Sequence, residues 1–386
     1  MGDGEFFLLG VIAGFVSGFI PGLHPNTLIS VLSSFGLDRH TFALLIISLY
    51  PANLISSYVP AIFFGIPENG TVISVLPGQR MVLEGRGLQA LKVVIFSTVI
   101  AVLLSVGFLY FSLDFFSVAY SAIKEYMKWI LLVAVLILLI RTKKPHLAIF
   151  VFLASGLLGK FSLGSDMADP FLPLFSGMFA LAAIMNYKKS SIPEQKDESI
   201  KFSFAKFTLI GVVLGVIADM VPGIGSPSQM ATFATVLMPI NTFGYMAMTS
   251  SISASQAIFA LATSVSIGKS RIGAIASLAE AIKINENLFL LITLFVLSMA
   301  ISVILVYAVR KQVAKLARID FSKINFVIAI YLFIITFLID GWLGCGVLCI
   351  GGVLGWLTVR LGVERTMLMG SIILPTLLLL FRIFWL

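Results

Sequence analysis

Residues 10–27 read GVIAGFVSGFIPGLHPNT, and residues 211–229 read GVVLGVIADMVPGIGSPSQ. Four positions match at one constant spacing, namely Gly10 with Gly211, Gly14 with Gly215, Pro21 with Pro222, and Gly22 with Gly223. Each copy is an apolar helix interrupted at Pro-Gly and followed by a short polar segment and a second apolar run. Interruptions of this kind, at corresponding places in two halves of an apolar chain, indicate the binding site of a transporter.

The composition of the chain assigns it to the membrane proteins. Of its 386 residues, 59% are hydrophobic and 11% are charged, whereas soluble domains are about 45–50% apolar and about 25% charged. The formal charge of +8 therefore does not point to nucleic acid, because basic residues of membrane proteins gather in cytoplasmic loops. The first residues carry no basic segment, so we expect no signal peptide there.

The apolar runs follow the same order in both halves of the chain. The first half contains the broken pair 6–20 and 27–36, a run at 41–66, a further interrupted segment up to residue 80, and runs at 88–112, 126–140, 146–162 and 169–187. The second half contains the broken pair 204–221 and 227–239, then 242–267, 271–283, 287–309, 324–339, 342–360 and 366–385. We interpret 113–125 as an interfacial segment. The repeated order predicts an internal duplication.

Equivalent loops carry different charges, which predicts the topology. The loop with Arg141, Lys143 and Lys144 is basic, but its counterpart around Asp340 has no basic residue. By the positive-inside rule the two loops lie on opposite sides of the membrane, so the halves are inverted. The sequence thus predicts an all-α polytopic protein with two inverted-topology repeats and broken, re-entrant helices. The expected divisions are a first repeat at 1–187, a cytoplasmic linker at 188–203 and a second repeat at 204–386, with both termini extracytoplasmic.

The segments after each Pro-Gly are the candidate substrate site. Helix N-termini expose unpaired N–H groups and a partial positive charge, so two half-helices pointing at one place can hold an anion such as a carboxylate or a phosphate. Glycines let a ligand approach the backbone, and the flanking polar residues suit helix starts. The alternative is that both interruptions only pack helices. The candidate residues are Gly22, His24, Asn26, Thr27, Gly223, Gly225, Ser226, Ser228 and Gln229.

Three further polar residues interrupt apolar runs. Asp219 precedes the second interruption, and ionisable residues at membrane depth are costly and usually functional. We expect it to bind a coupling cation, Na⁺ or H⁺, with a carboxylate that caps or pairs within the bundle as the alternative. Asn53 and Gln256 occupy matching positions in the two halves. They are predicted to line the cavity, unless they form only interhelical hydrogen bonds.

The sequence gives little support to catalysis. It has three histidines and none of the motifs of zinc hydrolases, serine hydrolases or nucleotide-binding loops. We therefore expect no enzyme, no metal and no cofactor, apart from a bound Na⁺. Cys345 and Cys349 lie one turn apart in an apolar run and are assigned to helix packing. Arg382 is expected to extend to the membrane interface.

Four passages resemble one family, the TctA-type large membrane (permease) subunit of tripartite tricarboxylate transporters, in a short archaeal-type form. They are the two Pro-Gly elements, Phe64-Gly65-Ile66-Pro67 through Ala90-Leu91, Phe175 through Ala180, and Asp340-Gly341-Trp342 through Gly370. The chain departs from the family's second Gly-Ile-Pro-Gly signature, where it has Ile267-Gly268-Lys269-Ser270-Arg271. The resemblance implies a secondary active transporter for di- or tricarboxylates. It also implies partners, namely a small membrane subunit and an extracytoplasmic binding protein.

Two other functions stay open at this point. Polyprenyl-phosphate translocases also carry duplicated Pro-Gly elements, and the same N–H groups could hold a lipid-linked phosphate. A membrane scaffold without transport activity is less compatible with polar residues at the interruptions. A homodimer is plausible for a transporter with moving parts. The sequence itself does not distinguish the substrate, the coupling ion or the direction of transport.

Overall fold

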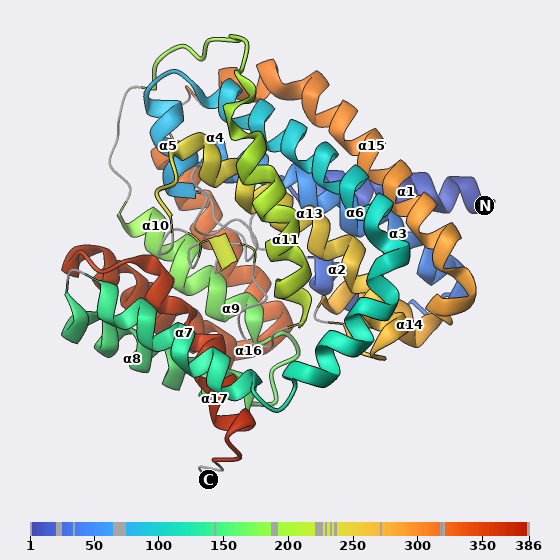
Figure 1. The fold of residues 1–386 in the computed structure, drawn as a ribbon. Helices are drawn as coiled ribbons and strands as arrows, with labels where there is room; N and C mark the ends of the chain where they lie inside the picture. The colour runs from blue at the N-terminus through green and yellow to red at the C-terminus, as the bar shows by residue number, and fades with distance from the viewer. Residues whose placement is uncertain are drawn as a thin grey trace.

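The structure is a computed structural model. It describes residues 2–20, 25–33, 35–64, 75–142, 144–186, 192–220, 227, 230–231, 234, 238–270, 272–316, 318 and 321–383. Throughout these ranges the regular secondary structure is helical, without strands. The helices form two groups that lie side by side (Figure 1), and each group draws helices from both halves of the sequence.

Bundle A is the larger group. Its helices are α1 (Asp3–Ser17), α2 (Pro25–Ser33), α3 (Arg39–Ser56), α4 (Tyr58–Phe63), α5 (Val75–Leu83), α6 (Gly87–Ile123), α11 (Ala205–Met220), α13 (Thr242–Ser266), α14 (Gly273–Ala281) and α15 (Ile284–Leu316). The short helix η2 (Phe202–Phe204) leads into α11. The closest packing joins α13 to α6 and α11, and α3 to α1 and α15. Helices α3 and α13 therefore occupy the centre of bundle A.

Bundle B contains the remaining helices. They are α7 (Met127–Arg141), α8 (Pro145–Leu163), α9 (Phe171–Phe175), η1 (Ser176–Leu181), α10 (Ala182–Met185), α16 (Phe321–Leu361), η3 (Arg365–Met369) and α17 (Gly370–Leu380). Here α8 packs on α17, and α16 packs on α9, η1 and α10. Among the described helices, all extensive contacts fall within one bundle or the other.

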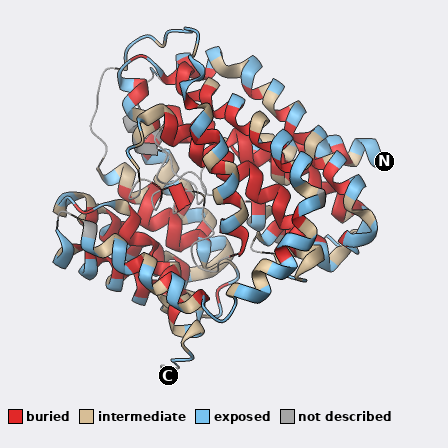
Figure 2. Ribbon diagram, in the orientation of Figure 1, coloured by how far each residue is buried: buried red, intermediate tan, exposed pale blue. Residues whose placement is uncertain are grey.

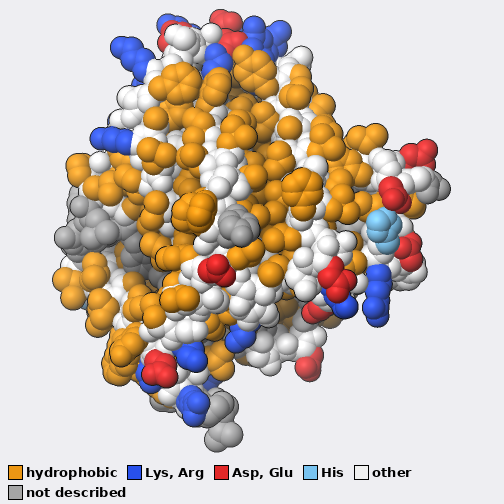
Figure 3. Space-filling view, turned by 45° about the vertical axis from the view of Figure 1, so that its right-hand side comes forward, with side chains coloured by type: hydrophobic (Ala, Val, Ile, Leu, Met, Phe, Trp, Pro, Cys, Tyr) orange, Lys and Arg blue, Asp and Glu red, His pale blue; other side chains and the backbone are white. Residues whose placement is uncertain are grey.

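The apolar surface of both bundles fits a membrane. Six helical stretches in the described ranges are long and apolar enough to span one: Arg39–Phe63, Gly87–Leu109, Pro145–Leu163, Phe202–Met220, Ile284–Leu316 and Asn325–Leu361. Figure 3 shows a broad hydrophobic surface, with most charged side chains gathered at its upper, lower and right-hand edges. Figure 2 shows the buried residues concentrated inside the bundles. The expected polytopic, all-α membrane fold is confirmed.

Glycines set the helix contacts of bundle A in a matched way. A Cβ added at Gly10 would lie 2.9 Å from the Leu45 carbonyl and would collide with Ser48 on α3. A Cβ at Gly211 would lie 2.8 Å from the Met248 carbonyl and 2.6 Å from Ser251 Cβ on α13. Small residues allow such close approach of membrane helices. The α1–α3 and α11–α13 pairs thus use the same contact at equivalent positions.

Bundle B has a second matched pair of contacts. A Cβ at Gly159 on α8 would lie 1.8 Å from the Ser371 carbonyl of α17, and one at Gly355 on α16 would lie 2.0 Å from the Met178 carbonyl of η1. In both cases a helix from one half of the sequence rests on the backbone of a helix from the other half. The two halves are therefore interlocked in bundle B.

One element differs from the expectation, and one predicted interruption is present. Helix α6 continues through 113–125 as far as Ile123, because its inner face still packs on bundle A: the Phe116 and Phe259 rings lie edge-on at 5.7 Å. The predicted runs at 324–339 and 342–360 are the two parts of α16, which meet at the non-helical Gly341 (φ 63, ψ −155). That conformation is accessible to glycine and strained for other residues. Cys345 and Cys349 lie on α16 as free thiols.

Candidate functional site

The first interruption lies between α1 and α2. Helix α1 ends at Ser17 and α2 begins at Pro25, so Gly22 and His24 lie outside the described residues. Asn26, in the first turn of α2, packs against Gly273 at the start of α14: a Cβ on that glycine would lie 2.7 Å from the Asn26 amide. Thr27 belongs to α2, but its side chain is outside the described part of the structure. The contact joins the polar segment of the first half to a helix of the second.

The second interruption follows α11, which ends at Met220. Gly223, Gly225, Ser226, Ser228 and Gln229 all lie outside the described residues. Asp219 lies in the last turn of α11 with only 3% of its surface exposed. The Thr263 hydroxyl of α13 donates a hydrogen bond to its carboxylate. Burying a carboxylate in a membrane bundle is costly, so this position calls for a functional or structural reason.

Two tyrosines of the first half lie beside polar groups of the second half. Tyr50 of α3 is within electrostatic reach of Asp219 and Tyr58. The Tyr58 hydroxyl of α4 and the Ser253 hydroxyl of α13 form a hydrogen bond of 3.1 Å, and Tyr58 also bonds to the side chain of Thr249. We call Tyr50, Tyr58, Thr249, Ser253, Asp219 and Thr263 the central polar cluster. It lies in bundle A and draws residues from both halves of the sequence.

Asn53 and Gln256 are both buried on the central helices, at 3% and 5% exposure. The Asn53 amide donates to the Ser17 hydroxyl at 2.9 Å, so it links α3 to the last turn of α1. Gln256 faces Gly215 of α11, where a Cβ would lie 3.0 Å from its backbone nitrogen. Both residues thus lie beside the helix that is interrupted in their own half.

The interpretation of the sequence missed five members of the central polar cluster. The long apolar runs 41–66 and 242–267 contain all five: Tyr50, Tyr58, Thr249, Ser253 and Thr263. Their only signal in the sequence was the presence of hydroxyl groups in apolar runs, which the structure shows as the largely buried helices α3, α4 and α13. That signal is weak, because serine and threonine in membrane helices usually bond to their own backbone. Ser251 and Ser255 do this at 2.6 and 2.7 Å.

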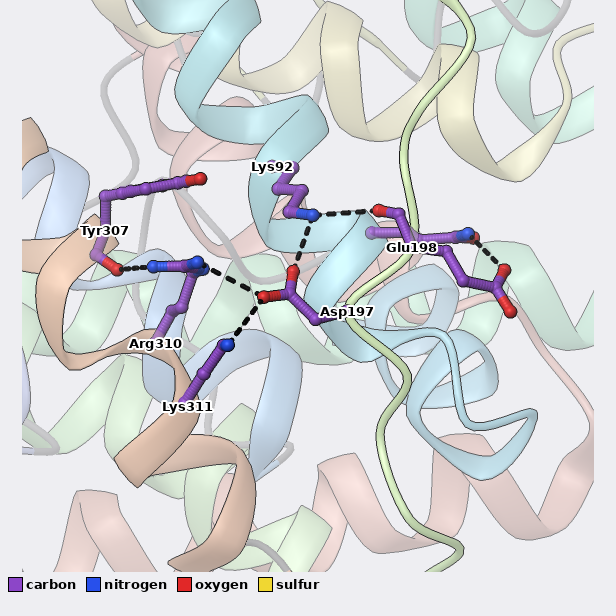
Figure 4. A network of polar contacts seen from close by, with 7 residues as sticks. Lys92, Asp197, Glu198, Tyr307, Arg310 and Lys311 are labelled. Atoms are coloured by element: carbon purple, nitrogen blue, oxygen red, sulfur yellow. Dashed lines mark hydrogen bonds and ion pairs between the residues drawn. The ribbon is translucent and has the colours of Figure 1, made fainter.

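The linker between the halves is fixed to bundle A by an ion cluster (Figure 4). The Asp197 carboxylate lies 2.5 Å from Lys92 Nζ of α6, 3.1 Å from Arg310 Nη2 and 3.4 Å from Lys311 Nζ of α15. Lys92 also donates to the Glu198 carbonyl at 2.8 Å. The hydrogen bond and charge of Lys92, with the charges of α15, lower the pKa of Asp197 to about 2. One carboxylate thus joins the beginning of α6 to the end of α15.

We expect Asp197→Asn to lower the melting temperature by about 2–4 °C, because it removes a partly buried network of three ion pairs. A depressed pKa makes this contribution fully present above about pH 4 and lost as the pH falls toward 2. The melting temperature of wild type and variant should therefore converge at low pH and at high salt. The matched control Glu286→Gln removes an exposed pair with Lys283. Equal effects of both substitutions would contradict a special role of Asp197.

Equivalent ends of bundle B are fixed by side chains of opposite charge. Lys144, just before α8, donates to the Leu361 carbonyl at the end of α16 at 2.7 Å. Asp340, just before the second part of α16, accepts from the Asp169 backbone N–H at 2.8 Å. A cation at a helix C-terminus and an anion at a helix N-terminus both complement the helix dipole.

Comparison with known proteins identifies the family. Residues 6–370 match the Tripartite tricarboxylate transporter TctA family. The chain belongs to the TctA family. A protein of Methanocaldococcus jannaschii that is described as uncharacterized is 26% identical over 348 residues, covering 86% of this chain and 84% of that protein. No solved structure matches the chain.

Membership of the TctA family confirms the resemblance noted in the sequence. The chain is a multi-pass membrane protein of the tricarboxylate-transporter type. TctA is a family of transporters, which agrees with the scarcity of catalytic motifs. The M. jannaschii relative has no assigned function, so it adds nothing on the substrate.

Proposed function

We propose that this TctA-family chain is a secondary active transporter that moves small organic anions, di- or tricarboxylates, coupled to Na⁺ or H⁺. The observation that carries the proposal is the central polar cluster, where the buried carboxylate of Asp219 lies at an interrupted helix end against Thr263. A carboxylate and a hydroxyl are suitable oxygen ligands for a cation or carriers of a proton. The backbone N–H groups after the two interruptions would bind the anion.

We also propose that the chain consists of two inverted repeats, 1–187 and 204–386, joined by a cytoplasmic linker. The matched glycine contacts of both bundles support the duplication. The ion cluster supports the inversion. Helices α6 and α15 hold equivalent places in the two repeats, yet Asp197 contacts α6 near its beginning and α15 near its end. The two helices therefore run in opposite directions. Both termini would then be extracytoplasmic. In Figure 1 the linker lies at the top and the C-terminus at the bottom.

Alternating access would follow from movement of one bundle against the other. The described helices make extensive contacts only within their own bundle, which favours rigid groups and a weaker boundary between them. The family further suggests a small membrane subunit and an extracytoplasmic binding protein as partners.

Ligand binding to the purified protein tests this proposal. We expect citrate, succinate or another dicarboxylate to raise the melting temperature in the presence of Na⁺ or at low pH, because a ligand bound only by the folded state stabilises it by mass action. At a ligand concentration 100 times the Kd the gain is about 2.7 kcal/mol. A short-chain polyprenyl phosphate is the comparison ligand. Stabilisation by the lipid phosphate alone would contradict the proposal and favour a lipid-carrier translocase.

A further inference from the structure

A second polar site, outside the central polar cluster, lies where the turn between α6 and α7 meets the end of α17. A cavity of about 340 Å³ is lined there by Lys124, Glu125, Lys128, Leu380, Phe381 and Arg382. Helix α6 belongs to bundle A, whereas α7 and α17 belong to bundle B. The cavity therefore lies at a covalent connection between the two bundles.

The charges of this cavity favour an anion. Three basic side chains and one carboxylate line it. Within the described part of the chain, no ion pair joins Lys124, Lys128 or Arg382 to an acidic side chain. Arg382 adopts a positive φ of 55°, the conformation with which the chain leaves α17. The start of α7 at Met127 adds the positive end of a helix dipole.

Aromatic rings beside the cations are typical of a membrane interface. Lys128 Nζ lies 5.6 Å from the centre of the Phe381 ring and 5.9 Å from that of Trp129. The two rings meet edge to face at 5.1 Å. Trp129 remains about half exposed. Tryptophan is enriched where the head groups meet the hydrocarbon, and basic residues there attract anionic lipids.

An exposed apolar stripe runs along α7 on the side of Trp129. Ile130, Val133, Ile137 and Ile140 are exposed and recur every three or four residues, so they lie on one face of the helix. Leu379 of α17 is 71% exposed next to the cavity. Figure 3 shows charged side chains at the lower end of the molecule directly below the hydrophobic surface. A polar pocket at the edge of an apolar surface matches a ligand with an anionic head and hydrocarbon tails.

We propose that this cavity binds the phosphate head group of an anionic phospholipid. Lys124, Lys128 and Arg382 contact the phosphate, and the acyl chains lie along the apolar stripe of α7. The bound lipid would hold the α6–α7 turn against the end of α17. This proposal does not depend on the transported substrate.

Native mass spectrometry and thermal shift in detergent test it, with phosphatidylglycerol and phosphatidylcholine of identical acyl chains. We expect phosphatidylglycerol to bind and stabilise the wild type more than phosphatidylcholine. The triple variant Lys124→Gln, Lys128→Gln, Arg382→Gln should weaken phosphatidylglycerol binding roughly 100-fold, at about fivefold for each basic residue. The control Lys269→Gln, Lys283→Gln, Lys315→Gln removes equal charge at exposed positions elsewhere and should bind like wild type.

Three results would overturn the proposal. They are equal stabilisation by both lipids, equal phosphatidylglycerol affinity of triple variant and wild type, and full stabilisation by inorganic phosphate or glycerol phosphate alone. The last would show a site for a free anion. If the triple variant does not fold, Arg382→Gln alone, at an exposed position after α17, should still weaken phosphatidylglycerol binding roughly fivefold.

Discussion

Gly355→Val is expected to disrupt bundle B. The first added carbon would lie 2.0 Å from the Met178 carbonyl and 2.6 Å from Ala182 Cβ. Neither backbone can move without separating α16 from η1. Overpacking of a tight core costs about 1–3 kcal/mol, and a clash with backbone lies at or above the upper end of that range. We therefore expect loss of the monodisperse folded protein in size-exclusion chromatography.

The same helix offers a matched control. A Cβ at Gly346 on α16 meets nothing within 4 Å, so Gly346→Val should leave the melting temperature within about 2 °C of wild type. The pseudo-equivalent substitution Gly159→Val on α8, where the Ser371 carbonyl lies 1.8 Å away, should be as harmful as Gly355→Val. A stable Gly355→Val protein, or equal damage from Gly346→Val, would contradict the packing described for bundle B.

Asp219→Asn is expected to remove ion coupling and leave the fold intact. The amide keeps the size of the side chain and can still accept the Thr263 hydrogen bond, but it carries no charge and takes up no proton at physiological pH. Coupling between two sites in a protein amounts to roughly 5–150-fold in affinity. Uptake driven by an ion gradient should therefore fall by a similar factor, toward the rate without a gradient.

Two further variants separate coupling from structure. Asp340→Asn changes a carboxylate to an amide in bundle B, where Asp340 binds the backbone at Asp169; it should keep its gradient-dependent uptake. Thr263→Ser retains the hydroxyl and should behave like wild type, whereas Thr263→Val should resemble Asp219→Asn. Unchanged gradient dependence in a folded Asp219→Asn protein would exclude this carboxylate from coupling.

The polytopic helical fold could be predicted because it depends on the length of the apolar runs and on the spacing of small residues, and both are local properties of the sequence. A run such as 284–316 must be helical in a membrane, since only helices satisfy the backbone there without partners. The repeated spacing of Gly10 and Gly14 was visible in the sequence, but it did not identify α3 as the helix that these glycines contact. Asp219 stood out because a charge in an apolar run has a high desolvation cost.

The arrangement of the bundles could not be predicted from the sequence. Their composition depends on contacts between segments far apart in the chain, such as Gly159 against Ser371, and a run of apolar residues carries no information about its partner. The hydrogen bond between Tyr58 and Ser253 could not be predicted for the same reason, because the two residues lie far apart in the chain. The linker at 188–203 was predicted as a cytoplasmic segment, but its contacts were not predicted, because the partners of Asp197 lie on α6 and α15.

The most direct test of the proposed function is uptake of labelled citrate and succinate into proteoliposomes that contain only this chain. Inward Na⁺ and H⁺ gradients are imposed separately, and the Asp219→Asn protein serves as the reference. We predict that at least one carboxylate accumulates above equilibrium under one of the gradients, and that this accumulation is absent in Asp219→Asn. Two results would contradict ion-coupled transport through the central polar cluster. One is accumulation to the same level by wild type and Asp219→Asn. The other is the absence of accumulation by a wild-type protein that binds carboxylates in the thermal assay.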